Sequence, residues 1–290
     1  MDNLKKRLEK AKGKWTEEFP GVLWSYGTTP KISTGFSPFT LAYGTEAVIP
    51  AEGKIACGIK VFDKMTKMGI QPNAITCNTL IHGLCRTGQV GPALQLKNNM
   101  SKWNRRPDGF SYNAIIDTLC KGGLLDQAMV LFTEMLGDSN VVPGVVAYNI
   151  LINGFGNSGR LKEAKRLFDE MVSRGISADL TTYNSMIDGH CVHGQQEEAR
   201  RCFDEMVDRG ISPDTVTFNV LIDSHCNDGM TEDAWGLFKL MDKINIPPDQ
   251  FTFNSMMDGL CLVGRLQDAV QLFDSMVDRA LNRMFSITIQ

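Results

Sequence analysis

Six asparagines recur at a nearly constant spacing in segments that otherwise have the apolar pattern of helices. Successive members are 35, 36, 35, 35 and 35 residues apart. Asparagine is a mediocre helix former, and well inside a helix it has no capping task. Its amide donates and accepts hydrogen bonds at once, which suits the edge of a nucleobase. We therefore predict a recognition task on the exposed face of each helix. The residues are Asn78, Asn113, Asn149, Asn184, Asn219 and Asn254.

Other residues that could carry chemistry do not form a known type of site. His190, Cys191 and His193 lie close together in the sequence, as do His225 and Cys226, but their spacing matches no common zinc pattern. The sequence shows no nucleophile with a base and an orienting group, no phosphate-binding loop and no glycine-rich dinucleotide turn. We therefore expect no metal, no cofactor, no small-molecule substrate and no enzymatic activity.

Five of the eight cysteines occupy one phase of the recurring string. Equivalent residues of stacked units cannot easily form a disulfide framework, so we expect reduced, buried thiols that fill apolar space. These residues are Cys85, Cys120, Cys191, Cys226 and Cys261.

Composition is that of a folded protein, with 43% hydrophobic and 22% charged residues among 290. The net charge of −3 does not favour a protein that coats nucleic acid through bulk charge. No apolar run approaches the roughly 18–20 residues that a membrane helix needs, so no membrane partner is expected. The basic N-terminal stretch has no long apolar core, and it resembles neither a secretory signal nor a transit peptide.

Each asparagine belongs to a unit in which further residues recur in register. With Asn at position 5, Gly recurs at position 15, Ala at 20 and Met at 27, whereas position 24 is Phe in five units and Lys97 in one. A Gly after an apolar run ends a helix, and the 20, 24, 27 spacing is the apolar stripe of a second helix. Each unit is predicted to contain helix A, a Gly turn, helix B and a short Pro/Asp loop. The units are 74–108, 109–144, 145–179, 180–214, 215–249 and 250–284.

No such unit can bury its apolar face alone, so neighbours must stack into an all-α solenoid. Units reading T-Y-N-x-L-I-D-G-x-C…G…A…L-F-D-E-M…G-I-x-P-D resemble pentatricopeptide repeats of the pure 35-residue class. Residues 53–73 resemble helix B of a half repeat, and residues 285–290 resemble the start of a further one. The resemblance implies a right-handed α-solenoid that binds single-stranded RNA, one base per repeat. It also implies a role in RNA processing, stability or translation in the mitochondrion or chloroplast.

The resemblance further implies which residues meet each base. Positions 5 and 35 of a repeat recognise the base edge together, and Asn with Asp resembles the family's uracil-preferring pair. Asn113 is followed by Gly144 at the end of its repeat, and its expected base is a pyrimidine. Asn254 is followed by Met284, which leaves the base of the last repeat open, and both are written Y. Because the family runs parallel to RNA, the expected core is 5′-UYUUUY-3′. The Asn–Asp pairs are Asn78 with Asp108, Asn149 with Asp179, Asn184 with Asp214 and Asn219 with Asp249.

Two further sets of contacts are implied. Position 13 often carries a basic residue for phosphate, which here holds only for Arg86 and Lys121. Because residues 53–290 carry 23 basic and 27 acidic residues, we expect weak RNA binding with a shallow salt dependence. Position 2 side chains of adjacent repeats hold the base between them. They are Ile75, Phe110, Val146, Thr181, Val216 and Phe251.

The aspartates at position 35 also have a structural alternative. Each precedes a predicted helix A, where a carboxylate caps the helix N-terminus. Capping and base recognition do not exclude each other, so both remain predictions.

Residues 1–52 lack the repeat. Their W-x-E-E-x-P-G-V-L-W-x-Y…T-G-x-[ST]-P-F-x-L-x-Y-G-T-E-A-V-I-P run resembles the end of the integrase core of plant gypsy-type retrotransposons. The catalytic carboxylates of that family lie upstream of this stretch, so the resemblance implies an inactive, retrotransposon-derived remnant rather than an independent domain.

Two alternatives to RNA binding follow from the same residues. A protein-binding solenoid is one, although the recurring Asn and Asp argue against it. A non-functional fusion of retroelement and repeats is the other, and the severed first repeat favours it. Uncapped solenoid ends predict protein contacts or end-to-end self-association.

Overall fold

The computed structural model describes residues 53–287 and places the side chains of residues 55–277. The predicted integrase-like segment lies outside the described residues. Within residues 53–287 the chain forms thirteen α-helices and one 3-10 helix and contains no strand, which confirms the all-α prediction. The chain divides into two compact units, Met1–Thr118 and Leu119–Gln290.

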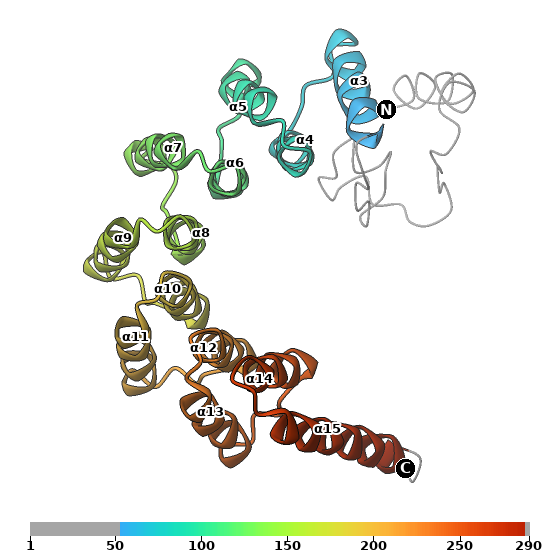
Figure 1. Cartoon of the computed structure of the whole chain (residues 1–290). Helices are drawn as coiled ribbons and strands as arrows, with labels where there is room; N and C mark the ends of the chain where they lie inside the picture. The colour runs from blue at the N-terminus through green and yellow to red at the C-terminus, as the bar shows by residue number, and fades with distance from the viewer. Residues whose placement is uncertain (1–52, 288–290) are drawn as a thin grey trace. The chain divides into compact units, whose positions relative to one another are not determined.

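The described part of the first unit consists of α3, the helix pair α4–α5 with η1, and most of α6, joined by short loops (Figure 1). Helix α4 begins at the first residue of the repeat assigned to 74–108, and α6 begins at the first residue of the next. The last turn of α6 belongs to the second unit. The elements are α3 (Gly53–Lys67), α4 (Ala74–Arg86), α5 (Val90–Asn99), η1 (Met100–Trp103) and α6 (Gly109–Lys121).

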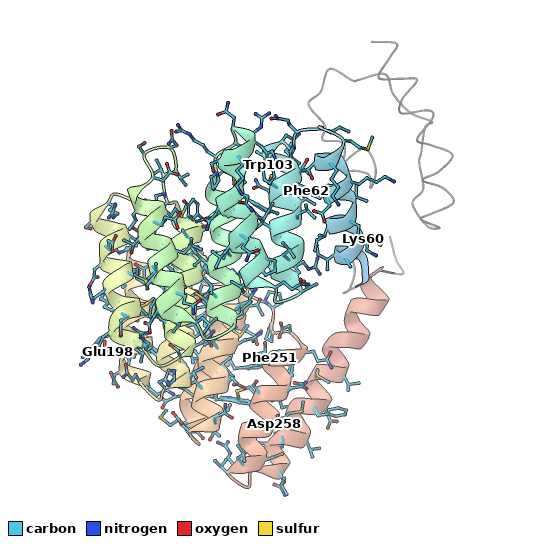
Figure 2. All side chains as sticks on the ribbon, turned by 90° about the horizontal axis from the view of Figure 1, so that it is seen from above. Lys60, Phe62, Trp103, Glu198, Phe251 and Asp258 are labelled. Atoms are coloured by element: carbon cyan, nitrogen blue, oxygen red, sulfur yellow. The ribbon has the colours of Figure 1, made fainter. Side chains whose placement is uncertain are left out.

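Aromatic contacts join the helices of this first unit. Phe62 of α3 meets Trp103 of η1 edge to face, with ring centroids 5.5 Å apart (Figure 2). Lys97, the exception in the Phe row, is only 2% exposed. Its ammonium nitrogen lies 4.8 Å from the centroid of the Tyr112 ring. The lysine therefore occupies the aromatic position of its repeat and contacts the next helix through a cation–π interaction.

The second unit repeats the same helix pair. In Figure 1, α8, α10, α12 and α14 lie in one row, and α9, α11 and α13 lie in a second row against it. The first row contains the A helices, which begin at the first residues of the predicted repeats. Helix α15 continues without a break past residue 284. The elements are α7 (Leu125–Gly137), α8 (Val145–Asn157), α9 (Leu161–Ser173), α10 (Leu180–Val192), α11 (Gln196–Asp208), α12 (Thr215–Asn227), α13 (Thr231–Lys243), α14 (Gln250–Leu262) and α15 (Leu266–Ile287).

Glycine serves two different purposes in these repeats. Gly194, between α10 and α11, has a φ of +68°, a left-handed conformation that ends helix A. Gly189, inside α10, lies against α8 instead. A Cβ atom at this residue would be 2.9 Å from the Cα atom of Gly156. Because backbone atoms cannot move aside as side chains do, only glycine permits this close approach of the two A helices.

The core of four repeat boundaries in the second unit contains an aromatic pair. Phe168 of α9 meets Tyr183 of α10 edge to face, with centroids 5.6 Å apart. Such pairs contribute about 0.5–1.5 kcal/mol beyond the area that they bury. The contact joins position 24 of one repeat to position 4 of the next. The other pairs are Phe132–Tyr148, Phe203–Phe218 and Phe238–Phe253.

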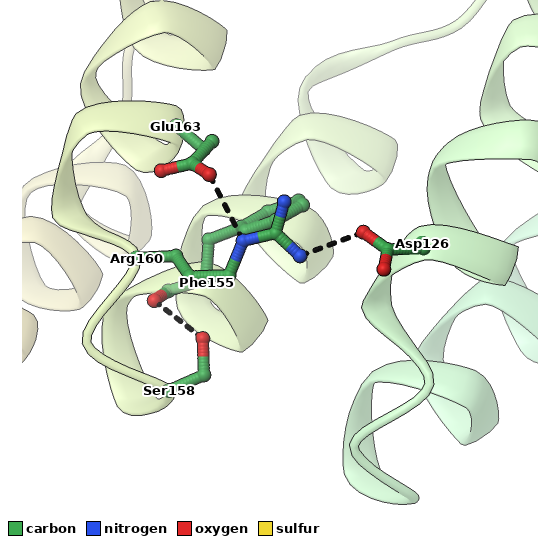
Figure 3. A network of polar contacts seen from close by, with 5 residues as sticks. All are labelled: Asp126, Phe155, Ser158, Arg160 and Glu163. Atoms are coloured by element: carbon green, nitrogen blue, oxygen red, sulfur yellow. Dashed lines mark hydrogen bonds and ion pairs between the residues drawn. The ribbon is translucent and has the colours of Figure 1, made fainter.

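Arginine links the B helices at two boundaries. The guanidinium of Arg160 is 2.7 Å from Asp126 of α7 and 3.0 Å from Glu163 of α9 (Figure 3). The same group lies 4.8 Å from the centroid of the Phe155 ring. Because these charges are exposed, each pair contributes little on its own. Arg265 repeats the arrangement with Glu232 and Asp268.

The cysteine prediction is correct for part of the row. Cys85, Cys191 and Cys226 are buried, and all described cysteines are free thiols. Cys120 is half-buried, whereas Cys261 is exposed, contrary to prediction. Cys226 packs against Gly259 of the next A helix, where a Cβ atom would approach it to 2.6 Å. Cys261 lies on α14, and the described residues contain no later A helix that could cover it.

Candidate nucleic-acid interface

The aspartates at position 35 cap the A helices. The Asp179 Oδ1 atom accepts a hydrogen bond from the backbone N–H of Thr182 at 2.9 Å, and the Thr182 hydroxyl accepts one from the backbone N–H of Asp179. This reciprocal capping box satisfies two otherwise unpaired donors at the start of α10. Asp214 with Thr217 and Asp249 with Thr252 repeat it at α12 and α14.

The same aspartates hold the predicted asparagines. The Asn149 amide nitrogen donates to Asp179 Oδ1 at 3.0 Å. The side chains come from the A helices of adjacent repeats, α8 and the start of α10. The structure thus brings together the two residues that the family resemblance pairs. The contacts recur as Asn78–Asp108 at 2.8 Å, Asn184–Asp214 at 3.3 Å and Asn219–Asp249 at 3.1 Å.

A hydroxyl group holds the other end of each amide. The Thr182 Oγ1 atom is 2.7 Å from Asn149 Oδ1 and donates to it. Sequence reasoning missed this residue, although its spacing was visible as Asp-x-x-Thr at the start of α10, α12 and α14. The equivalent contacts are Thr217–Asn184 at 2.7 Å, Thr252–Asn219 at 2.6 Å and Ser111–Asn78 at 2.5 Å.

These contacts correct the prediction that each asparagine acts on the exposed face of its helix. Asn149 and Asn219 are each 8% exposed, and their amides link one repeat to the next. Asn78 and Asn184 are half-buried in the same arrangement, and Asn254 is exposed. The two hydrogen bonds explain how a poor helix former is accommodated inside a helix.

Asn113 differs from the asparagines in these four pairs. Its side-chain oxygen is buried, and the described residues contain no hydrogen-bond partner for it. The residue at position 35 of its repeat is Gly144, which begins α8 without a side-chain cap. Position 3 of the following repeat is Ala147, which has no hydroxyl. This repeat therefore lacks both residue types that hold the amide elsewhere.

The side chains at position 2 are exposed in every repeat. Five of these side chains are 51–55% exposed although they are large and apolar, and Thr181 is also exposed. Each lies three residues before an asparagine, so both occupy one side of helix A. The five are Ile75, Phe110, Val146, Val216 and Phe251.

Within the second unit, one groove contains residues of positions 2 and 5 together. Val216 of α12 and Phe251 of α14 line a groove of about 600 Å³, and Asn219 lies in the same lining. The groove thus has apolar side chains from adjacent repeats and an amide in one lining. Asp188, Asp223 and Asp228 also line the groove, and its lining includes no Lys or Arg.

The carboxylates of this surface differ in the direction of their pKa shifts. Burial alone would raise the pKa of Asp179, but hydrogen bonds from Thr182 and Asn149 lower it below its ordinary value of 3.8. The pKa values of Asp214 and Asp249 are lowered in the same way. Burial raises the pKa of Asp188, which lies in the groove wall. The capping aspartates are therefore fully charged near neutral pH.

Basic residues at position 13 are confined to the first two repeats. Arg86 and Lys121 are exposed, so both are accessible to a phosphate. In the later repeats the position holds exposed neutral side chains. They are Asn157, Val192, Asn227 and Leu262.

The histidine clusters take part in the packing of the repeats. His193 Nε2 donates to the carbonyl oxygen of Gly156 at 3.0 Å, and His190 Nδ1 is 2.9 Å from the Gln195 side-chain oxygen. Among the described residues no group of three or more His, Cys, Asp or Glu could hold a metal ion. No helix in the described part of the chain is long and apolar enough to cross a membrane.

Sequence models of known repeat families match this chain. The sequence model of the PPR repeat family matches residues 51–86, 72–121, 143–192, 178–227 and 213–262, and that of the PPR repeat matches 110–139 and 251–281. Together they cover most of the chain. The chain therefore belongs to the pentatricopeptide repeat family.

Two relatives of this chain are plant proteins. The Arabidopsis thaliana pentatricopeptide repeat-containing protein At2g16880 is 29% identical over 128 residues, which are 43% of this chain and 17% of the relative. A second Arabidopsis thaliana relative, the chloroplastic pentatricopeptide repeat-containing protein At3g09650, is 26% identical over 114 residues, 39% of this chain and 15% of the relative. The chain thus spans about a sixth of the length of these curated relatives.

The maize protein PPR10 is similar in structure. Its crystal structure has a TM-score of 0.62 and 29% identity, and the match covers 78% of this chain and 32% of PPR10. The structure of PPR10 with an 18-nt psaJ RNA element has a TM-score of 0.53 and 22% identity, covering 79% and 38%. These matches agree with a solenoid of helix pairs.

Proposed function

We propose that this chain binds single-stranded RNA without catalysis and that each repeat contacts one base. The observation that carries the proposal is the row of asparagine amides beside half-exposed apolar side chains from adjacent repeats. The groove around Asn219, Val216 and Phe251 shows how one unit of this row is built. Stacking on apolar and aromatic walls supplies affinity for any base, and the amide supplies selectivity.

The proposed target is a short pyrimidine strand, 5′-UYUUUY-3′. Uracil is assigned to the four repeats in which Asn and Asp are in contact. The first repeat is included because Asn78 and Asp108 meet as the later pairs do. One solved structure contains PPR10 in complex with an RNA element, which supports RNA as the class of ligand. The chloroplastic relative supports a role in organellar transcript processing, stability or translation.

Affinity is proposed to be modest. Only the first two repeats present a basic side chain at position 13, and aspartates line the groove between α10, α12 and α14. Phosphate neutralisation supplies much of the affinity of nucleic-acid complexes and makes it depend on salt. We therefore propose weak binding with a shallow salt dependence.

The test compares a U-rich with an A-rich strand of equal length. Wild type should prefer the U-rich strand by about tenfold or more, since each well-placed base contact contributes about 1–3 kcal/mol of discrimination. The triple variant Asn149/Asn184/Asn219→Ala should lose that preference. A control variant, Asn98/Asn140→Ala, removes two exposed amides and should keep it.

Four results would contradict the proposal. Wild type without a preference for the U-rich strand contradicts it, as does a triple variant that remains folded by circular dichroism and keeps the preference. A folded monomer without RNA affinity would favour a protein-binding solenoid. An aggregated wild type would favour a non-functional fusion.

A further inference from the structure

The hydroxyl that touches each asparagine oxygen suggests a second level of selectivity. The side-chain amide has nearly the same shape when it is turned by 180°, so only its partners define which end is nitrogen. In α8 the nitrogen of Asn149 faces the Asp179 carboxylate, and its oxygen faces the Thr182 hydroxyl. A turned amide would place its oxygen against the negatively charged carboxylate.

The Thr182 hydroxyl has one proton and two possible acceptors for it. Thr182 Oγ1 accepts the backbone N–H of Asp179, so one of its two lone pairs is used. Its single proton lies between two acceptors, Asn149 Oδ1 at 2.7 Å and Asp179 Oδ1 at 2.9 Å. Asp179 Oδ1 already accepts from the Thr182 backbone and the Asn149 amide. The proton therefore goes to the asparagine oxygen, which is the closer acceptor and has no other donor.

We propose that these hydroxyls are positioning residues that fix the orientation of the asparagine amide and thereby separate uracil from cytosine. The proposal rests on the proposed function. The residues are Ser111, Thr182, Thr217 and Thr252.

The chemistry of the two bases explains the selectivity. With both ends held, the amide offers a base at most one N–H and one lone pair, in fixed places. Uracil presents carbonyl oxygens beside an N–H group, whereas cytosine presents an amino group beside a bare ring nitrogen. An amide in one orientation complements uracil, and the turned amide complements cytosine. A held amide therefore distinguishes the two pyrimidines, and an unheld one accepts both.

The chain contains a natural contrast. Among the described residues the side-chain oxygen of Asn113 has no partner, and its repeat ends in Gly144 rather than Asp. We expect the base at this repeat, the second of the six, to be read as uracil or cytosine alike. Asn184 in the fourth repeat is held by Asp214 and Thr217 and should read uracil alone.

The experiment measures the ratio of dissociation constants for strands that differ only by C or U at the fourth base. Wild type should favour U by about tenfold, the size of one good base contact. Thr217→Val keeps the side-chain shape but removes the hydroxyl, and the ratio should fall below about threefold. Thr217→Ser restores the hydroxyl and should restore the ratio. The same exchange at the third base, read by Asn149, should be unaffected in every variant.

Several outcomes would overturn the inference. One is a folded Thr217→Val variant with the full wild-type ratio, and another is a loss of selectivity at the third base as well. If Thr217→Val does not fold, binding of the wild-type chain to strands with C or U at the second base still tests the inference. C and U must then bind there within about twofold, and a larger difference contradicts the inference. Absence of any preference for the U-rich strand in wild type contradicts the proposed function itself.

Discussion

Helices α6 and α10 carry asparagine at the same position of their repeats, yet the two amides have different surroundings. Asn184 of α10 donates to Asp214 and accepts from Thr217. Asn113 of α6 has a buried side-chain oxygen without a partner in the described part of the chain. The same residue type is thus a held, oriented group in one helix and an incompletely satisfied one in the other. What an asparagine does here depends on residues 30 and 33 positions further along the chain.

The partners of Asn184 affect both the stability of the chain and the proposed recognition of a base. A satisfied intramolecular hydrogen bond contributes about 1 kcal/mol net, whereas a buried polar atom without a partner costs about 1–3 kcal/mol. The groups that hold Asn184 therefore stabilise the boundary between two repeats while they orient the amide. Substitutions at the two asparagines and their partners should separate these contributions.

The largest effect is expected from Asp214→Ala. This change removes the N-cap of α12 and the acceptor for the Asn184 amide. Loss of a cap costs about 0.5–2 kcal/mol, so we expect a decrease of about 2 kcal/mol in the free energy of unfolding when the second hydrogen bond is included. Urea unfolding followed by circular dichroism measures it. Asp126→Ala, which removes an exposed carboxylate from an ion pair, is the control and should cost much less. Equal effects would contradict the assignment.

A smaller, opposite pair of effects is expected at the asparagines. Alanine is the better helix former by about half a kcal/mol. Asn184→Ala loses two hydrogen bonds and should still destabilise the chain by about 1 kcal/mol. Asn113→Ala removes the unpaired buried oxygen and should leave stability unchanged or raise it by a few tenths of a kcal/mol. Equal destabilisation by the two substitutions in urea unfolding would show that Asn113 is held as firmly as Asn184.

The smallest effect is expected in how the stability of the chain depends on pH through Asp214. The pKa of Asp214 is below 3.8 in the folded chain because hydrogen bonds from Thr217 and Asn184 outweigh burial. The stabilisation by this carboxylate is therefore fully present above its ordinary pKa of 3.8 and is lost as the pH falls through the lower, folded value. Asp214→Asn does not titrate at this site. The difference in melting temperature between wild type and this variant should be constant from pH 7 to 5 and shrink below 3.8. A difference that changes between pH 7 and 5 would contradict this sign.

Much of the fold follows from the repeat in the sequence. Gly at position 15 and the apolar residues at 20, 24 and 27 predict where helices end and which faces pack, because these depend on local conformation and periodicity. The contacts of Asp179 were only partly predictable. Capping is local and was foreseen, whereas the hydrogen bond from Asn149 joins residues 30 positions apart. The family resemblance supplied the pairing, but not its geometry.

Other features needed the packed structure. The hydroxyl of Thr182 has two roles, and its position in a helix gives no sign that it reaches an amide of the preceding repeat. Lys97 interrupts the Phe row, yet it is buried against the ring of Tyr112. Cys261 has the same phase as Cys226 but is exposed. Each depends on which neighbour covers a side chain, and a single repeat does not contain that information.

The most direct test of the account is a cytosine scan of the bound strand. Wild-type chain is titrated with 5′-UUUUUU-3′ in adenine flanks and with six variants, each carrying one C, and the dissociation constants are compared. We expect strands with C at base one, three, four or five to bind about tenfold more weakly, because Asn and Asp are in contact in the repeats assigned to these bases. C at base two should change the constant by less than about twofold. A flat profile, or the largest loss at base two, would contradict recognition of one base per repeat by a held asparagine.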